Sequence, residues 1–399
     1  MRDVVIVGAG PVGGYAARRL AEAGMDVLLL EEHSEIGRPF QCAGLVNPTS
    51  MVKVDLRETI LQDVAGARIH GPTNTMVPVG VDEVIRTHVV CRKRFDEAVV
   101  LQGMNAGAEL WLRTRPTDMA LDSEGVTIDL NREGFHEQIR TRLVIGADGA
   151  HSWVRRTMKL GRPKELMIGF QAEVTGYQGR TGWLDMYLGS DYAPGFFAWV
   201  IPSGHGTHRI GLWSRPDDLD GRSLESSYDA LLDHPIHAGR FKDIKEIARF
   251  CGPIPSGIVR RPYAERVMLI GDASGGAKPT TGGGIGPGFA QVDAMTTELS
   301  EAVRRNDLRA SIMKRIARHH GPIRKEQDRA RALRDFFLTT REDEELDRFV
   351  ATFARPEVLE LINAQGDIEH PVRLGMSLLK RVPEFRGLAI KAGWSLVMS

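Results

Sequence analysis

Glycines near the N-terminus and an acidic residue after them have the types and spacing that suit phosphate binding. Gly8, Gly10 and Gly13 form the pattern G-x-G-x-x-G, whose bare backbone N–H groups can approach a pyrophosphate closely. Glu31 follows about twenty residues later, where a carboxylate can accept hydrogen bonds from ribose hydroxyls. Cys42 comes next, in the segment GRPFQCAGLV, and its thiol can either pack in a core or act beside a bound cofactor.

The elements that must position these residues are a strand, a tight turn, a helix and a second strand. Residues 4–7 and 27–30 are short apolar runs, and helical spacing of small residues lies between them. Gly8 permits the turn, Gly10 lets a pyrophosphate approach, and Gly13 lets the helix pack on the strand. The pattern predicts a dinucleotide-binding unit, and by itself it does not separate FAD from NAD.

Another cluster of glycines follows a buried strand predicted over residues 267–270. That strand leads into Gly271 and Asp272, which puts a carboxylate at the sheet edge where α/β proteins bind ligands. Gly284 and Ile285 then open a helix whose free N–H groups suit a pyrophosphate or the N1/O2 edge of a reduced flavin. We expect Asp272 to accept a hydrogen bond from a ribityl hydroxyl.

Two further stretches complete this pattern. CRKRFDEAVV begins at residue 91 and places Arg92 at the start of a predicted helix. TRLVIGADGAHSWVRR predicts a strand over residues 143–145 and then a glycine-rich turn, which we expect Asp148 to close. Because the first glycine motif starts so early and Cys42 follows its second strand, the combination is typical of an FAD flavoprotein.

The composition excludes several other classes of protein. The chain has 399 residues, of which 52 are basic and 52 are acidic, so no overall field attracts a polyanion and no nucleic-acid partner is expected. Cys42, Cys91 and Cys251 are far apart and form no CxxC pair, so neither a metal site nor a disulfide framework is expected. Without a signal-peptide pattern or a long apolar run, we expect a cytoplasmic protein.

These motifs resemble the p-hydroxybenzoate hydroxylase type of FAD flavoprotein and, within it, the geranylgeranyl reductase family. The narrower resemblance rests on EIGRPFQCAGL, on PGFFAWVIP at residues 194–202 and on KPTTGGGIG at residues 278–286. It covers residues 1–300 and continues more loosely through the tail. Two features differ from the family pattern: the cysteine loop is one residue shorter, and Ile201 replaces a phenylalanine of the second motif.

The resemblance implies an α/β fold with a Rossmann-like FAD-binding domain, an antiparallel β-sheet substrate domain and a helical C-terminal region. Residues 1–60, 90–160 and 262–300 would form the FAD-binding domain, residues 61–89 and 161–261 the substrate sheet, and residues 301–399 the helical region. Together with the turn glycines, it implies these FAD contacts, with the proline near the adenine: Gly8, Gly10, Gly13, Glu31, Cys42, Ala43, Arg92, Pro116, Asp272, Gly284 and Ile285.

Alternating apolar residues in PGFFAWVIP point to a substrate surface. Phe197, Trp199 and Ile201 would face one side of a strand and, with Pro202, form an apolar wall for an isoprenoid chain beside the flavin. The pattern alone is explained equally well by an ordinary hydrophobic core. The assignment to a substrate wall is therefore implied by the resemblance.

The implied activity is reduction of double bonds in prenyl lipids. A hydride would pass from N5 of the reduced flavin to one alkene carbon, and a proton would reach the other carbon. We expect Cys42 to donate that proton or to position the alkene. Two alternatives stay open: a monooxygenase acting on an aromatic or quinone substrate, and a flavin-carrying protein that binds prenyl lipid without catalysis. The electron donor is either ferredoxin or NAD(P)H.

The basic region RIARHHGPIRKEQDRARALRDFF is predicted to be a solvated helix surface, and this includes His319 and His320. The alternative is a contact with anionic membrane lipid, to which the C-terminal segment FRGLAIKAGWSLVMS would contribute. A peripheral location at a membrane is thus the alternative to a purely cytoplasmic one.

Overall fold

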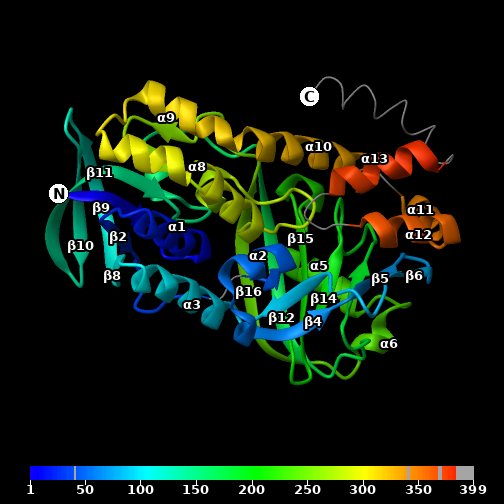
Figure 1. Ribbon diagram of the computed structural model, residues 1–399. Coiled ribbons are helices and arrows are strands. Elements are labelled where there is room, and N and C mark those ends of the chain that lie inside the picture. The colour runs from blue at the N-terminus through cyan, green and yellow to red at the C-terminus, as the bar shows by residue number, and fades with distance from the viewer. Residues whose placement is uncertain (40–41, 339–341, 367–370, 383–399) are drawn as a thin grey trace.

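The computed structural model describes residues 1–39, 42–338, 342–366 and 371–382. Two large sheets occupy opposite ends of the molecule in Figure 1, and α10 (Gly321–Leu338) runs along one side from the first sheet to the second. The predicted α/β fold with a helical C-terminal region is confirmed. The C-terminal segment FRGLAIKAGWSLVMS lies outside the described residues.

The first sheet has eight strands, and its centre is parallel. Its core is β1, whose Val4 and Ile6 enter one apolar cluster while Val5 and Val7 enter another. Because both faces of the sheet are covered, the strand is apolar throughout. In spatial order the path is β17 (Tyr263–Ala264), β18 (Val267–Leu269), β11 (Phe135–Gly146), β1 (Arg2–Val7), β2 (Val27–Leu30) and β8 (Glu109–Trp111), with β9 (Thr114–Leu121) and β10 (Val126–Arg132) joined through β11.

Three helices cover one face of this sheet: α1 (Pro11–Glu22), α3 (Arg92–Asn105) and α8 (Ile285–Arg304). Close packing between α1 and α3 depends on Gly14, because a Cβ atom there would lie 2.8 Å from a methyl carbon of Val100. The face holds α1 centrally, with α3 and α8 on either side of it (Figure 1). This arrangement brings the first turn of α1 and the first turn of α8 to the same edge of the sheet.

The second sheet has seven strands, all antiparallel to their neighbours except for the pair β13 and β5. Side chains of Ala198 and Val200 in β14 lie in the apolar cluster beneath α5 (Leu224–Leu232) and α6 (Ala238–Phe241). In spatial order the strands are β16 (Lys245–Ser256), β12 (Glu165–Thr175), β15 (Thr207–Ser214), β14 (Ala198–Pro202), β13 (Trp183–Tyr187), β5 (Gly66–His70) and β6 (Met76–Gly80).

A three-stranded sheet and several short elements connect the two large sheets. Its strands are β3 (Leu45–Val46), β7 (Thr87–Val90) and β4 (Ile60–Val64). Short helices and turns fill the remaining connections: α2 (Pro48–Val54), η1 (Arg57–Thr59), α4 (Trp153–Thr157), η2 (Pro216–Leu219) and α7 (Gly271–Ser274).

The C-terminal region is helical as far as it is described. After α8 come α9 (Ala310–Ile316), η3 (Ala317–His320), α10, α11 (Asp343–Phe353), α12 (Pro356–Gln365) and α13 (Pro371–Arg381). The prediction of a solvated helix surface here is wrong for several residues. His320 has no exposed surface, and Gln327 and Arg334 are each 3% exposed, because α10 packs with a polar face against the rest of the chain.

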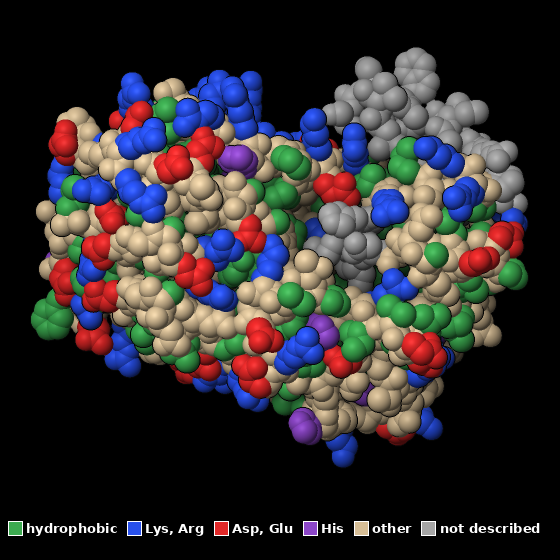
Figure 2. All heavy atoms as spheres, viewed as in Figure 1, with side chains coloured by type: hydrophobic (Ala, Val, Ile, Leu, Met, Phe, Trp, Pro, Cys, Tyr) green, Lys and Arg blue, Asp and Glu red, His purple; other side chains and the backbone are tan. Residues whose placement is uncertain are grey.

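Charged side chains of both signs are mixed across the face shown in Figure 2, as the equal numbers of basic and acidic residues suggest. Within the described ranges, no helix combines the length and the apolar character that crossing a bilayer requires.

Burial of His320 makes the stability of the fold depend on pH. Neither ring nitrogen has a hydrogen-bond partner among the described residues. Burial, together with the charge of Arg324, lowers the pKa of His320 from 6.5 to about 4. The folded state therefore holds the ring neutral. This contribution is fully present above pH 6.5, and protonation of the unfolded chain removes it as the pH falls.

We predict that the free energy of unfolding falls by about 3 kcal/mol because of this residue between pH 6.5 and pH 4. His320→Leu should remove that part of the pH dependence, as measured by urea unfolding at a series of pH values. His136→Leu, at an exposed position on β11, is the matched control and should keep it. An unchanged pH profile in His320→Leu would contradict the prediction.

Candidate functional site

The turn between β1 and α1 leaves open space directly above its middle glycine. Gly8 has a φ of +100°, and a Cβ atom there would lie 2.6 Å from the carbonyl oxygen of Ala147. Gly13 packs its Cα against the Gly8 carbonyl, so helix and strand meet closely. A Cβ atom on Gly10 would meet nothing within 4 Å. The exposed N–H groups at the start of α1 can therefore receive a phosphate group.

Glu31 lies at the end of β2, over this turn. Its carboxylate accepts hydrogen bonds from the backbone N–H of Ala9 at 3.0 Å and from the Nδ1 of His33 at 2.6 Å. Pro116 lies nearby on β9, where the backbone N–H of Thr114 donates to the carbonyl of Glu31 at 2.8 Å. The structure thus brings the predicted ribose-binding carboxylate and the predicted adenine neighbour to one side of the turn.

A second phosphate-binding edge lies where α7 and α8 begin. Gly284 caps α8, and a Cβ atom there would lie 2.6 Å from an oxygen of Asp272. Burial raises the pKa of the Asp272 carboxyl to about 6, although the charge of Arg92 opposes the rise. The structure gives this carboxyl no hydrogen-bond partner among the described residues. It is a buried acceptor in need of a donor, as a ribityl hydroxyl would be.

The glycine-rich turn after β11 is closed by Asp148, as predicted. This carboxylate accepts hydrogen bonds from the Ser152 hydroxyl at 2.6 Å and from the backbone N–H of Val154 at 2.9 Å. Arg155, in the following α4, donates to the carbonyl of Ala273 at 2.8 Å. Asp148 therefore shapes this turn, and Arg155 ties the turn to the segment that carries Asp272.

Arg92 occupies the first turn of α3 and forms a bidentate pair with Asp96, with N–O distances of 3.0 and 2.8 Å. Burial alone would lower the pKa of Arg92, but the charges of Asp96 and Cys42 outweigh it and raise that pKa. Arg92 also donates a hydrogen bond to the Cys42 sulfur, which accepts another from the backbone N–H of Gly44 at 3.4 Å. The predicted Arg92 and Cys42 thus lie together.

Arg209 is a site residue that sequence analysis missed. From β15, its Nη1 donates to the carbonyl of Ala43 at 2.7 Å and to that of Val90 at 3.3 Å. Burial lowers the pKa of Arg209, and the residue is 3% exposed. It anchors the cysteine loop to the second sheet. The alternation of residues 207–214 indicates which side Arg209 faces, but no motif indicates this contact.

Four aromatic residues form a continuous surface at the edge of the second sheet, and we call this surface the aromatic wall: Phe196, Phe197, Trp199 and Trp213. The Phe196 and Trp213 ring centroids are 4.8 Å apart, and those of Phe197 and Trp199 are 6.4 Å apart. A Cβ atom on Gly282 would lie 3.1 Å from the Trp213 ring. The aromatic wall therefore adjoins the glycine segment that leads into α8.

The remaining predicted wall residues lie deeper. Ile201 is 2% exposed and packs with Ala43 and Val89, and Pro202 is also buried. Phe197 and Trp199 are only partly buried, so they offer surface to a ligand, whereas Ile201 supports the cysteine loop from below. Next to Phe196, a cavity of about 360 Å³ lies between the 189–196 loop and the adjoining ends of α10 and α11.

These features fit a flavin dinucleotide. Two helix starts, at Gly10 and Gly284, open toward the same edge, and Glu31 and Asp272 supply carboxylate acceptors there. Residues that would hold the cofactor come from segments more than two hundred residues apart. The arrangement matches a molecule with a pyrophosphate between two sugar-like chains.

Comparison with known proteins agrees with this fit. The model of the FAD binding domain family matches residues 1–309 of the chain. Digeranylgeranylglycerophospholipid reductase 2 from Methanopyrus kandleri is 30% identical over 397 residues, which covers 96% of each chain. Digeranylgeranylglycerophospholipid reductase from Methanosarcina acetivorans is 33% identical over 297 residues, which covers 71% of each chain.

Solved structures share the fold. A geranylgeranyl bacteriochlorophyll reductase-like protein from Thermoplasma acidophilum superposes with a TM-score of 0.86 at 23% identity and covers 98% of this chain and 99% of its own. A p-nitrophenol 4-monooxygenase from Pseudomonas putida superposes with a TM-score of 0.72 at 16% identity and covers 96% and 97% of the two chains. With the cofactor cradle described above, these matches show that the protein binds FAD and belongs to the geranylgeranyl reductase family of flavoproteins.

Proposed function

We propose that this protein reduces isoprenoid double bonds in prenyl lipids of the digeranylgeranylglycerophospholipid type. One observation carries the proposal: the aromatic wall adjoins the glycine segment before α8, so an apolar chain laid on Trp199 would lie beside the cofactor. Relatives named as reductases of such lipids support the same substrate class. The cavity next to Phe196 offers further space for the chain.

When bound, FAD in its reduced form supplies the hydride for this reaction. The residues of the chain perform the other tasks. N–H groups at Gly284 and Ile285 face the negative charge that a reduced flavin carries. The aromatic wall excludes water from the reacting carbons, so that a proton is delivered only from a positioned group.

Cys42 is the group that we propose for proton delivery. Its sulfur lies against the Arg92 guanidinium and the Gly44 N–H. Both donors favour the thiolate that remains after the thiol has given its proton away. Ala43, the next residue, is held by Arg209 through its carbonyl, and this anchors the loop that carries the thiol.

The two alternative functions predict different products. A monooxygenase is favoured by the fold shared with p-nitrophenol 4-monooxygenase, and a lipid carrier would bind without turnover. The test is to reduce the FAD-loaded protein with dithionite without oxygen and add digeranylgeranylglyceryl phospholipid. Mass spectrometry should show a gain of about 2 Da per double bond. Unchanged lipid, or a gain of about 16 Da that requires oxygen, would overturn the proposal.

The electron donor and the location are proposed at the same level. Ferredoxin and NAD(P)H are the two donors to compare, each added in place of dithionite in the same assay. The protein is proposed to work in the cytoplasm with a peripheral contact at the membrane that holds its lipid. Sedimentation with liposomes of that lipid tests the contact, and protein that stays in the supernatant would contradict it.

Replacement of the thiol tests the role of Cys42. We predict that Cys42→Ser keeps its FAD and lowers kcat by about 100-fold, since a hydroxyl is a much weaker acid in this place. Single-turnover oxidation of the reduced flavin by lipid measures the rate. Cys251→Ser, at an exposed cysteine on β16, is the matched control and should turn over normally. Full turnover by Cys42→Ser would exclude a chemical role for the thiol.

Shortening the aromatic wall tests the substrate surface. Trp199→Ala should raise KM for the lipid by about tenfold or more, because it removes a large apolar contact. Trp199→Phe should recover most of the loss. Phe135→Ala removes an aromatic ring that is 73% exposed on β11, so it serves as the control and should leave KM unchanged. An unaltered KM in Trp199→Ala would place the substrate elsewhere.

A further inference from the structure

Helix α10 presents a buried polar face that the proposed chemistry does not use. Arg324, Gln327, Arg331 and Arg334 recur every three or four positions, so they lie on one side of the helix. A helix that packs on a protein ordinarily does so through an apolar stripe. Here the packed side consists of side chains that donate hydrogen bonds, and their acceptors identify what the helix holds.

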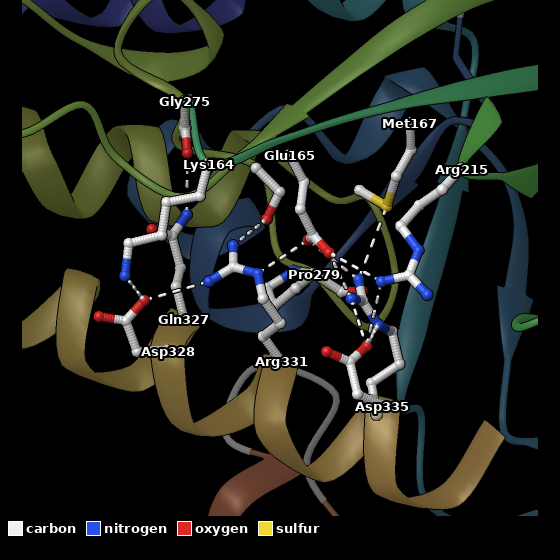
Figure 3. A network of polar contacts seen from close by, with 12 residues as sticks. Lys164, Glu165, Met167, Arg215, Gly275, Pro279, Gln327, Asp328, Arg331 and Asp335 are labelled. Carbon is white, nitrogen blue, oxygen red and sulfur yellow. Dashed lines mark hydrogen bonds and ion pairs between the residues drawn. The ribbon is translucent and has the colours of Figure 1, made fainter. Parts of the chain in front are cut away.

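Gln327 binds the segment that follows α7. Its Nε2 donates to the carbonyls of Gly275 and Ala277 at 3.0 and 2.9 Å, and its Oε1 accepts from the backbone N–H of Ile258 at 3.1 Å (Figure 3). All three bonds are buried. One amide group therefore satisfies backbone atoms from two segments that water cannot reach.

Arg334 binds the next part of the same segment. Its guanidinium donates to the carbonyl of Pro279 at 2.9 Å and to Glu165 at 2.6 Å, and it lies 4.8 Å from the ring centroid of Phe196. Arg331 also donates to Glu165, at 2.8 Å (Figure 3). The Arg334 side chain is 1% exposed. A single side chain thus touches the glycine segment, β12 and the aromatic wall.

The held carbonyls determine the position of the glycines beyond them. Pro279 lies inside a tight turn, in which the N–H of Lys278 donates to Gly283 at 3.1 Å and the N–H of Gly282 donates to Lys278 at 3.0 Å. Gly284, directly after this turn, caps α8. A shift of the Pro279 carbonyl would therefore move the glycines that open toward the cofactor.

We propose that Gln327 and Arg334 are positioning residues that hold residues 275–284 against the flavin and Phe196 in the aromatic wall, so that α10 couples cofactor binding to substrate binding. The inference rests on the proposed placement of the flavin at Gly284. It assigns to the C-terminal helix a role in the cofactor site, although none of its side chains needs to touch the cofactor.

Two mild variants test the proposal. Gln327→Met keeps the shape of the side chain and removes the amide, and Arg334→Lys keeps the charge and removes the planar fork. Each should raise the Kd for FAD by about tenfold, as measured by quenching of flavin fluorescence. Each should also shift the visible absorbance bands of bound flavin, and Arg334→Lys should in addition raise KM for the lipid. Arg329→Gln, exposed on the same helix, is the control and should change none of these.

A merely structural role predicts a different result. If the variants lower the melting temperature of the apoprotein while the Kd for FAD and the flavin spectrum stay unchanged, the proposal is overturned. Gly284→Val separates this failure from failure of the flavin placement, since a side chain there would meet Asp272. A changed flavin spectrum in Gly284→Val with none in the α10 variants would overturn the positioning role alone. An unchanged spectrum in Gly284→Val would overturn both.

Discussion

Helices α1 and α8 touch at their first turns, and the cofactor site depends on that contact. Gly288 and Gly271 both lie directly against Val12, and a Cβ atom on Gly271 would approach the Val12 side chain to 3.2 Å. Larger residues would separate the two helices. Because they meet, the unpaired N–H groups of both helix starts open toward one edge of the sheet, where their partial positive charges add.

Buried guanidinium groups then connect this edge to distant segments. Arg92 pairs with Asp96 and contacts Cys42, Arg209 holds Ala43, and Arg334 pairs with Glu165. A buried charge is tolerated only when acceptors surround it, and a guanidinium has enough donors to satisfy several of them at once. Each of these arginines therefore fixes at least two segments of backbone relative to one another.

The strands of the second sheet serve the core and the site at the same time. Along β14, Ala198 and Val200 pack beneath α5, while Trp199 and Ile201 face the cofactor side. Along β15, Ile210 and Leu212 pack in the same core, while Trp213 joins the aromatic wall. The two-residue period of a strand makes this division possible. Since monooxygenases share the fold, it is this outer face, and not the architecture, that selects the chemistry.

Local sequence determined the parts of the protein whose physics is local. The strand, the glycine turn and the helix up to Glu31, the turn closed by Asp148, and the helix start after Gly284 all depend on backbone conformations that neighbouring residues dictate. Tertiary structure alone decided that Arg209 would anchor the cysteine loop, that Ile201 would lie under that loop, and that His320 and Arg334 would be buried. A basic, polar helix such as α10 has the pattern of a solvated surface. It is buried because the carbonyls that its donors require lie some fifty residues earlier in the chain, and no pattern within a helix records where such partners will be.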